Sequence, residues 1–212
     1  QVGSIDGIDG LLDVDGGTGG LDILNVDDSR ALDSNDKTGS LTESSLRGLD
    51  LPSGIDYANI EELTLWLGYG DNTFDIDSTH AGTSTVNTAQ GEDTVNVNGA
   101  SGTLVVNGEA DRDTINVNGT SVGSTSTLNS HGGDDIFNIR GMAGRVNVRG
   151  GDDDDTINVS DASPFLSVKP LPSGERTTQV GSIDGIDGLL DVDGGTGGFD
   201  IMNVDDSAAP AS

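Results

Sequence analysis

Aspartates recur in short, glycine-rich stretches of this sequence, and carboxylate oxygens are the ligands that calcium prefers in proteins. Gly91-Glu-Asp93, Gly132-Gly-Asp-Asp135 and Gly150-Gly-Asp-Asp-Asp-Asp155 are clear cases. Flexible turns that offer only oxygen ligands suit calcium better than zinc or a transition metal. We therefore predict bound calcium. The predicted ligands are Asp22, Asp71, Asp93, Asp111, Asp113, Asp134, Asp135, Asp152, Asp153, Asp155 and Asp200.

An apolar phrase follows each of the central acidic turns at a nearly constant spacing. Asp93-Thr-Val-Asn-Val, Asp113-Thr-Ile-Asn-Val, Asp135-Ile-Phe-Asn-Ile and Asp155-Thr-Ile-Asn-Val begin 20, 22 and 20 residues apart. Polar and apolar residues alternate within each phrase, which is typical of a strand with one buried face. A fixed period of this length is typical of stacked repeats, in which no unit buries its apolar face alone.

The alternation also predicts which side chains form the core. Two inward rows are expected on one wall: Val95, Ile115, Phe137 and Ile157 beside Val97, Val117, Ile139 and Val159. The phrases between them supply the opposite wall: Leu104 with Val106, Val146 with Val148, Ser84 with Val86, and Ser126 with Leu128. The predicted fold class is all-β, a parallel β-solenoid with two short strands in each turn of 20–22 residues. Equal periods should place the four Asp-containing phrases side by side and in register.

In such a stack the acidic turns share one edge. Neighbouring turns lie about 4.8 Å apart, the strand spacing of a β-sheet. Carboxylates at that interval repel one another unless a cation lies between them. The turns before the other strands, such as Gly99-Ala-Ser-Gly102, are poor in acid. The ion sites are therefore expected on one side only.

Residues 27–70 follow the short period less well. Gly39–Leu46 and Ile60–Leu67 are predicted strands, and Asp27–Lys37 is predicted to be a polar loop. Trp66 is expected to pack in the core or at the solenoid edge. Three prolines between residues 161 and 178 predict an edge strand and a loop there.

The two ends of the chain share a second, longer sequence repeat. Residues 1–34 and 179–212 agree at 29 of 34 positions. We interpret residues 1–178 as one solenoid unit and residues 179–212 as the start of the next unit in a tandem array. The chain begins at Gln1 without Met or a signal peptide, so we expect a mature fragment or a piece of something longer.

Composition excludes several classes of function. The net charge of −28 disfavours nucleic acid and anionic membrane surfaces as partners. Cysteine is absent, so disulfides and thiolate metal sites play no part. No apolar run approaches the roughly 18 residues of a membrane-spanning helix, so membrane insertion is not expected.

The acidic turns resemble the Gly-Gly-x-Gly-x-Asp-x-apolar-x nonapeptides of RTX-type (haemolysin-type) calcium-binding repeats. Gly150–Asn158 matches this pattern except at Asp153, which replaces the fourth-position Gly. His131–Phe137 keeps the later Gly, the Asp and the apolar residue. The period here is 20–22 rather than 18, and only alternate turns are acidic. The resemblance implies calcium in fewer, one-sided sites.

A looser resemblance spans nearly the whole chain. Very large extracellular proteins with tandem units contain stretches similar to Asn25–Ser29, Ile55–Leu63 and Thr79–Thr85. That resemblance implies a secreted surface, matrix or fibre protein. The expected function is a structural or adhesive extracellular spacer or filament unit, stabilised by calcium. Its units would be joined covalently or associate head to tail.

Two alternatives stay open. An outward Thr/Asn row, with Thr94, Asn96, Thr114, Asn116, Asn138, Thr156 and Asn158, would suit carbohydrate or ice. A carbohydrate-active β-helix enzyme is the other, but the Arg, Lys and aromatic residues that hold sugars are scarce, so catalysis is not expected. His80 and His131 are interpreted as surface turn residues. Asn118 and Asn158 lie in glycosylation sequons.

Overall fold

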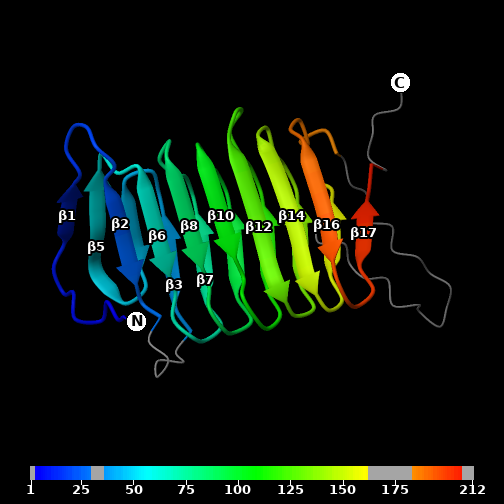
Figure 1. Ribbon diagram of the computed structural model, residues 1–212, viewed down its shortest axis with the longest axis horizontal. Helices are drawn as coiled ribbons and strands as arrows, with labels where there is room; N and C mark the ends of the chain where they lie inside the picture. The colour runs from blue at the N-terminus through cyan, green and yellow to red at the C-terminus, as the bar shows by residue number, and fades with distance from the viewer. Residues whose placement is uncertain (1–2, 30–35, 162–182, 207–212) are drawn as a thin grey trace.

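The computed structural model describes residues 3–29, 36–161 and 183–206 (Figure 1). Within these ranges every helix or strand is a β-strand, and the strands form two sheets that face each other along the length of the molecule. The described ranges contain no helix that is long and apolar enough to cross a membrane. The all-β, parallel solenoid fold predicted from the sequence is confirmed.

Sheet A has ten described strands. In spatial order they are β1 (Leu12–Asp15), β5 (Leu51–Ala58), β4 (Ser45–Gly48), β3 (Thr38–Leu41), β7 (Thr73–Ile76), β9 (Thr94–Val97), β11 (Thr114–Val117), β13 (Ile136–Ile139), β15 (Thr156–Val159) and β17 (Ile201–Val204). All neighbouring pairs are parallel except β3–β4 and β4–β5.

Sheet B has seven described strands, all parallel to their neighbours. In spatial order they are β16 (Leu190–Gly195), β14 (Arg145–Asp152), β12 (Thr125–Gly132), β10 (Thr103–Asn107), β8 (Thr83–Asn87), β6 (Glu62–Trp66) and β2 (Ile23–Asp27). From β6 to β15 the chain alternates between the sheets, so each solenoid turn contains one strand of each.

The predicted register is confirmed. Asn96 lies opposite Asn116, Asn116 opposite Asn138, and Asn138 opposite Asn158 on successive parallel strands of sheet A. In sheet B, Leu104 lies between Ser84 and Ser126 in the same way. Equal repeat lengths therefore stack equivalent residues, as the sequence periods predicted.

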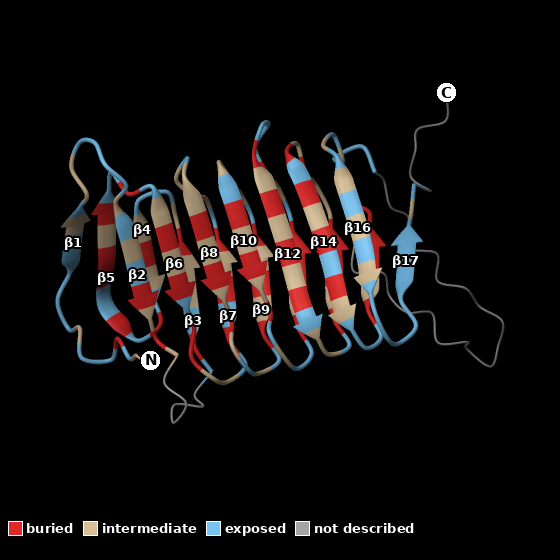
Figure 2. Cartoon of the chain, in the orientation of Figure 1, coloured by how far each residue is buried: buried red, intermediate tan, exposed pale blue. Residues whose placement is uncertain are grey.

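The core fills the space between the sheets, and the predicted inward rows form it (Figure 2). Every one of the sixteen side chains assigned to these rows is at most 4% exposed. Full burial of an aliphatic or aromatic side chain contributes about 1.5–3 kcal/mol. Because each row continues from turn to turn, no single turn would be stable alone.

The main departure from the predicted fold lies between residues 38 and 58. Gly39–Leu46 is not one strand: β3 and β4 are antiparallel and are joined by a turn at Thr42–Ser44, and β5 was not predicted. Leu41 and Leu46 are both buried, but an apolar pattern interrupted by a short turn can be mistaken for one strand. Gly48 (φ +75°) makes the reversal into β5 possible, because a Cβ there would lie 2.2 Å from the Thr38 carbonyl oxygen.

Other local predictions have mixed outcomes. Ile60–Leu67 contains β6, as predicted. The edge strand and loop predicted for residues 161–178 lie outside the described residues except for Asp161. Trp66 is not in the core: it lies on the outward phase of β6, where Leu63 and Leu65 point inward, and it is 36% exposed.

Candidate functional site

The turns that lead from sheet B into sheet A form the acidic edge of the solenoid. From residue 67 to residue 155 each of these turns ends in a buried polar residue directly before the sheet A strand. That residue is Asn72 in the first turn and aspartate in the next four. We call these four the inner row: Asp93, Asp113, Asp135 and Asp155.

The inner row forms a continuous column of hydrogen bonds. The backbone N–H of Asp93 donates to Oδ1 of Asp113 (2.9 Å), and the N–H of Asp113 donates to Oδ1 of Asp135 (2.7 Å). The N–H of Asp135 donates in turn to Oδ1 of Asp155 (3.1 Å), whose own N–H donates to Oδ1 of Asp200 (3.1 Å). Each carboxylate therefore connects two successive turns.

The second carboxylate oxygen, Oδ2, of each inner-row residue is buried and has no hydrogen-bond partner. The pKa values of these groups rise because burial disfavours the charged form. Burial raises the pKa of Asp93 and of Asp155 to about 7 and that of Asp113 to about 8, and it also raises the pKa of Asp135. Burial therefore favours the protonated form of these carboxyl groups up to a higher pH than in an exposed aspartate.

Asn72 shows what a neutral side chain does at this position. Its Oδ1 accepts the backbone N–H of Lys37 (3.1 Å), so it continues the column. Its Nδ2 donates to the carbonyl oxygens of Gly68 and Gly70, both at 2.9 Å. A protonated aspartate has an O–H donor in place of the amide N–H. The inner row is thus built for a neutral, hydrogen-bonding group.

A second set of acidic residues lies on the solvent side of the same turns. We call Asp71, Asp111, Asp134, Asp152 and Asp153 the outer carboxylates; all five are exposed. Several also bridge turns: Asp71 accepts the N–H of Glu92 (2.9 Å), and Asp134 accepts the N–H of Asp154 (3.1 Å). These contacts leave most of their oxygen atoms in solvent.

The two sets differ in how they fit calcium. Calcium takes six to eight oxygen ligands at about 2.3–2.6 Å. In the described residues, no three His, Asp or Glu side chains converge to hold a metal ion. The inner row does not fit, because its Oδ2 atoms are buried beside glycine backbone: a Cβ on Gly108 would lie 2.3 Å from Oδ2 of Asp113, and one on Gly150 would lie 2.1 Å from Oδ2 of Asp155. The outer carboxylates are the set that calcium could reach.

The remaining predicted ligands, Asp22 and Asp200, lie at opposite ends of the molecule. Asp200 ends the turn between β16 and β17 and continues the column, although it is exposed. Asp22 lies elsewhere: it ends the turn from β1 in sheet A to β2 in sheet B, where its N–H donates to Glu61 (2.9 Å). The turns in this direction form the opposite edge, so Asp22 does not join the other ligands.

A buried ion pair, which was not predicted from the sequence, begins the column at the N-terminal end. Nζ of Lys37 lies 2.8 Å from Oδ2 of Asp28, and both side chains are at most 2% exposed. Asp6, at 3.2 Å, also contacts the lysine. The segment Asp27–Lys37 was predicted to be a polar loop, but Asp28 and Lys37 within it are buried. A single lysine following a run of acidic residues is the signal that could have pointed to this pair.

Amide side chains form ladders on the outer side of sheet A. Nδ2 of Asn116 donates to Oδ1 of Asn96 (2.8 Å), and the pattern continues through Asn138 and Asn158 (2.9 and 3.0 Å). Asn116, Asn138 and Asn158 are buried. This row is therefore not the open Thr/Asn face expected for a ligand. Asn158 offers no accessible amide for a glycan, whereas Asn118 is exposed.

The outer side of sheet B carries the more regular polar face. Its outward rows are Thr83, Thr103 and Thr125; Thr85, Val105 and Thr127; and Asn87, Asn107 and Asn129. Nδ2 of Asn107 donates to Asn87 (2.7 Å), and Nδ2 of Asn129 donates to Asn107 (2.9 Å). Trp66 extends the asparagine row toward the N-terminal end, because it pairs with Asn87.

His80 lies in a separate pocket of about 350 Å³, lined in part by Tyr57 and Glu61. Its Nδ1 is 3.2 Å from Oγ of Ser84. Ser84 is completely buried, so this pair is not open to a substrate. His131 is at the surface, as expected, but it lies within β12 rather than in a turn.

Comparison with family models, curated proteins and solved structures finds no match to this chain.

Proposed function

We propose that this chain is a unit of a structural, extracellular β-solenoid that serves as a spacer or filament. Units would join where the repeated segment, which forms β16 and β17 at the end of this chain, pairs with strands equivalent to β5 and β6 of the following unit. The proposal rests on the segment that the two ends of the chain share.

The observation that supports this pairing is a difference in burial between equivalent positions of the two copies of the repeated segment. Val26 in β2 is 4% exposed, whereas its counterpart Val204 in β17 is 58% exposed. Ile5 is 5% exposed and its counterpart Ile183 is 36% exposed. At the N-terminal end, β5 and β6 pair with β1 and β2 and cover the segment. Nothing in the described chain lies beyond β16 and β17 (Figure 2).

Both copies of the segment make the same local contact. The N–H of Ile5 lies 3.4 Å from Oδ1 of Asp28, and the equivalent N–H of Ile183 lies 3.4 Å from Oδ1 of Asp206. The second copy also ends in strands, β16 and β17, whose outer edges are unpaired in the described residues. Such an open sheet edge is a template for pairing with another strand.

The same pairing would also supply a partner for Asp206. Its counterpart Asp28 is neutralised by the buried Lys37 of the unit body. In a following unit the equivalent lysine would reach Asp206, because the two copies place this aspartate alike. Apolar burial and a charge pair would thus form together at each junction.

In this proposal calcium binds the outer carboxylates. The chain has 37 acidic and 9 basic residues, so cations that bind the exposed edge would reduce repulsion between turns. The inner row is stabilised by protons and hydrogen bonds instead. The resemblance to extracellular repeat proteins supports a location outside the cell.

A chain of two units tests the end-to-end pairing. It consists of residues 1–178 followed by residues 1–212, and Val204→Asp is compared at its junction and in the single chain. In the single chain Val204 is exposed, so the free energy of unfolding should change by no more than about 0.5 kcal/mol. At the junction this position is also Val26 of the second unit, which its own β6 covers, so a loss of stability in the second unit is expected in any case. If one segment serves both units, the buried charge should also destabilise the first unit by at least about 2 kcal/mol, measured by hydrogen exchange in β14 and β15. Val122→Asp, at an 87% exposed position, is the control. A loss confined to the second unit would refute the pairing.

A further inference from the structure

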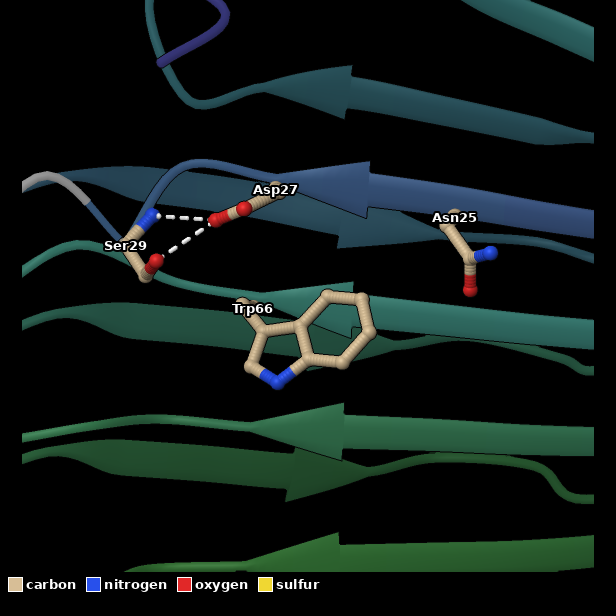
Figure 3. Close-up of a pocket in the computed structure, with 4 residues that line it drawn as sticks. All are labelled: Asn25, Asp27, Ser29 and Trp66. Atoms are coloured by element: carbon tan, nitrogen blue, oxygen red, sulfur yellow. Dashed lines mark hydrogen bonds between the residues drawn. The ribbon is translucent and has the colours of Figure 1, made fainter. Parts of the chain in front are cut away.

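The outer face of sheet B contains a pocket where β2 and β6 lie side by side. Asn25, Asp27, Ser29 and Trp66 line this pocket, which has a volume of about 490 Å³ (Figure 3). Pockets that bind small ligands have volumes of about 300–1,000 Å³. The pocket lies on the face of sheet B, next to the turns that begin the acidic edge, and its lining residues all belong to one chain.

Trp66 provides the floor of this pocket. Figure 3 shows the indole ring on the face of the sheet, with Asp27 and Asn25 beside it on the neighbouring strand. Its Nε1–H has no hydrogen-bond partner among the described residues. An exposed indole has both an apolar face and a polar N–H. It is also the single tryptophan of a chain with only 3% aromatic residues.

The polar residues around the ring are held in place. Oδ1 of Asp27 accepts hydrogen bonds from both the N–H (3.0 Å) and the hydroxyl (2.6 Å) of Ser29. Asp27 pairs directly with Trp66 across the two strands, and Asn25 is exposed two residues earlier on the same face. An aromatic plane flanked by a fixed carboxylate and a free amide combines stacking with hydrogen bonding.

We propose that this pocket binds a neutral pyranose unit of a glycan, with the apolar face of the sugar on Trp66 and its hydroxyl groups on Asn25 and Asp27. A pyranose with equatorial hydroxyl groups presents flat patches of C–H bonds on its faces and polar groups around its rim. That distribution matches an indole plane with polar side chains at one side. A β-1,4-linked glucan is the simplest glycan of this kind.

Charge selects against acidic sugars. Burial alone would raise the pKa of Asp27, but the hydrogen bonds from Ser29 hold that pKa below its ordinary value. Asp27 is therefore ionised at neutral pH, and the chain as a whole carries a net charge of −28. A uronate would meet this charge at close range, whereas hydroxyl groups can donate to the carboxylate.

Strand pairing also explains why the pocket would recur in a filament. Three of its residues belong to the repeated segment, whose second copy contains Asn203, Asp205 and Ser207 in the same order. The tryptophan belongs to the body of the unit. If units join as proposed above, each junction completes another pocket. The single-chain pocket does not depend on that assembly, so the two ideas can fail separately.

Tryptophan fluorescence of the single chain tests the proposal directly. Cellohexaose is the probe, and hexameric oligogalacturonate is its acidic counterpart. We expect cellohexaose to change the emission of Trp66 saturably, and the acidic oligosaccharide to bind at least about tenfold more weakly. Asp27→Asn should reduce this difference between the two sugars. Absence of a saturable change with millimolar cellohexaose would overturn the proposal.

Calorimetric titration of cellohexaose extends the test to variants that lack the fluorophore. Trp66→Asn continues the asparagine row of Asn87 and should lower the affinity at least about tenfold. Trp66→Tyr keeps an aromatic plane and should retain binding within a few fold. Thr103→Ala, at an exposed position two strands away on the same face, should bind like the parent. Unchanged affinity in a folded Trp66→Asn variant would also refute the site.

Discussion

The backbone N–H of Asp113 donates a hydrogen bond of 2.7 Å to Oδ1 of Asp135, one solenoid turn further along. The same contact repeats through the inner row, and each row member leaves its second oxygen buried and without a partner. Stacked aspartates therefore link the turns, but they do so best when each carries a proton.

The first prediction concerns pH. The unfolded pKa of aspartate is about 3.9, and the folded values of Asp93, Asp113 and Asp155 are about 7, 8 and 7. Between these limits the folded chain binds more protons than the unfolded chain, so the free energy of unfolding falls as pH rises. We expect the melting temperature to decrease from about pH 4 to pH 8. A melting temperature that rises over this interval would contradict the protonated column.

Asp113→Asn tests how much one inner-row carboxyl group contributes to this fall in stability with rising pH. The amide keeps an oxygen to accept the N–H of Asp93 and adds a donor like that of Asn72. We expect the variant to melt at a higher temperature than the parent at pH 8 and at a similar temperature at pH 5. Each unit of raised pKa corresponds to about 1.4 kcal/mol. Asp134→Asn, on the exposed side of the same edge, should show no such difference between the two pH values.

The second prediction concerns the buried ion pair at the N-terminal end. Lys37→Met leaves the buried Asp28 without its counter-charge, and loss of one partner of a buried pair typically costs about 3–5 kcal/mol. Chemical denaturation should show this loss. The double variant Lys37→Met/Asp28→Leu should recover much of it.

Arg149→Met is the matched control for Lys37→Met, because it breaks an exposed pair. Arg149 and Asp193 are 54% and 64% exposed, and their charged atoms lie 3.5 Å apart. Exposed pairs contribute about 0–1 kcal/mol. Equal losses of stability for Lys37→Met and Arg149→Met would show that burial does not strengthen the Lys37–Asp28 pair.

The third prediction concerns calcium. At fixed high sodium chloride, millimolar calcium should raise the melting temperature above that in chelator, since an ion that binds only the folded state adds about 2.7 kcal/mol at a hundredfold excess over its Kd. Asp71→Asn and Asp134→Asn should reduce the rise, because the outer carboxylates face solvent. Asp135→Asn should leave it intact. Identical melting curves with calcium and with chelator would exclude a calcium role in stability.

The fourth prediction concerns separate chains. If β16 and β17 of one chain replace β1 and β2 on the β5 and β6 strands of another, the chains associate by exchange of an identical segment. Sedimentation should then show concentration-dependent association that Val204→Asp weakens at least about tenfold. Val122→Asp should not weaken it. Association that is equally strong in both variants would assign it to another surface.

The sequence predicted the repeating part of this fold well, for a physical reason. In residues 73–159 inward apolar and outward polar positions alternate with few exceptions, such as Val105, so one register buries the apolar rows and a slip by one residue would expose them. Residues 38–58 lack that constraint. The β3–β4–β5 meander depends on residues with a left-handed backbone conformation, such as Leu49 (φ 54°) and Asp50 (φ 61°). Their residue types do not predict that conformation.

The acidic edge was predicted in position but not in structure. Sequence spacing showed that carboxylates gather there, yet it could not distinguish Asp134 from Asp135, which are neighbours with opposite environments. Their separation depends on the turn conformation, which directs one side chain to solvent and the next under the strand. Asp22 shows the same limit: its sequence context is that of Asp200, but its turn runs from sheet A to sheet B.

The β3–β4–β5 meander also has a consequence for the shape of an assembly. It inserts β4 and β3 between β5 and β7, where sheet B has no extra strand between β6 and β8. Sheet A is thereby longer by two strand spacings, about 10 Å, and a unit tapers toward sheet B. The repeated segment places Leu12–Asp15 in sheet A, but its counterpart strand β16 in sheet B. In a stack built as proposed, the longer side would alternate from unit to unit, so successive bends would cancel and the filament would run straight with a period of two units.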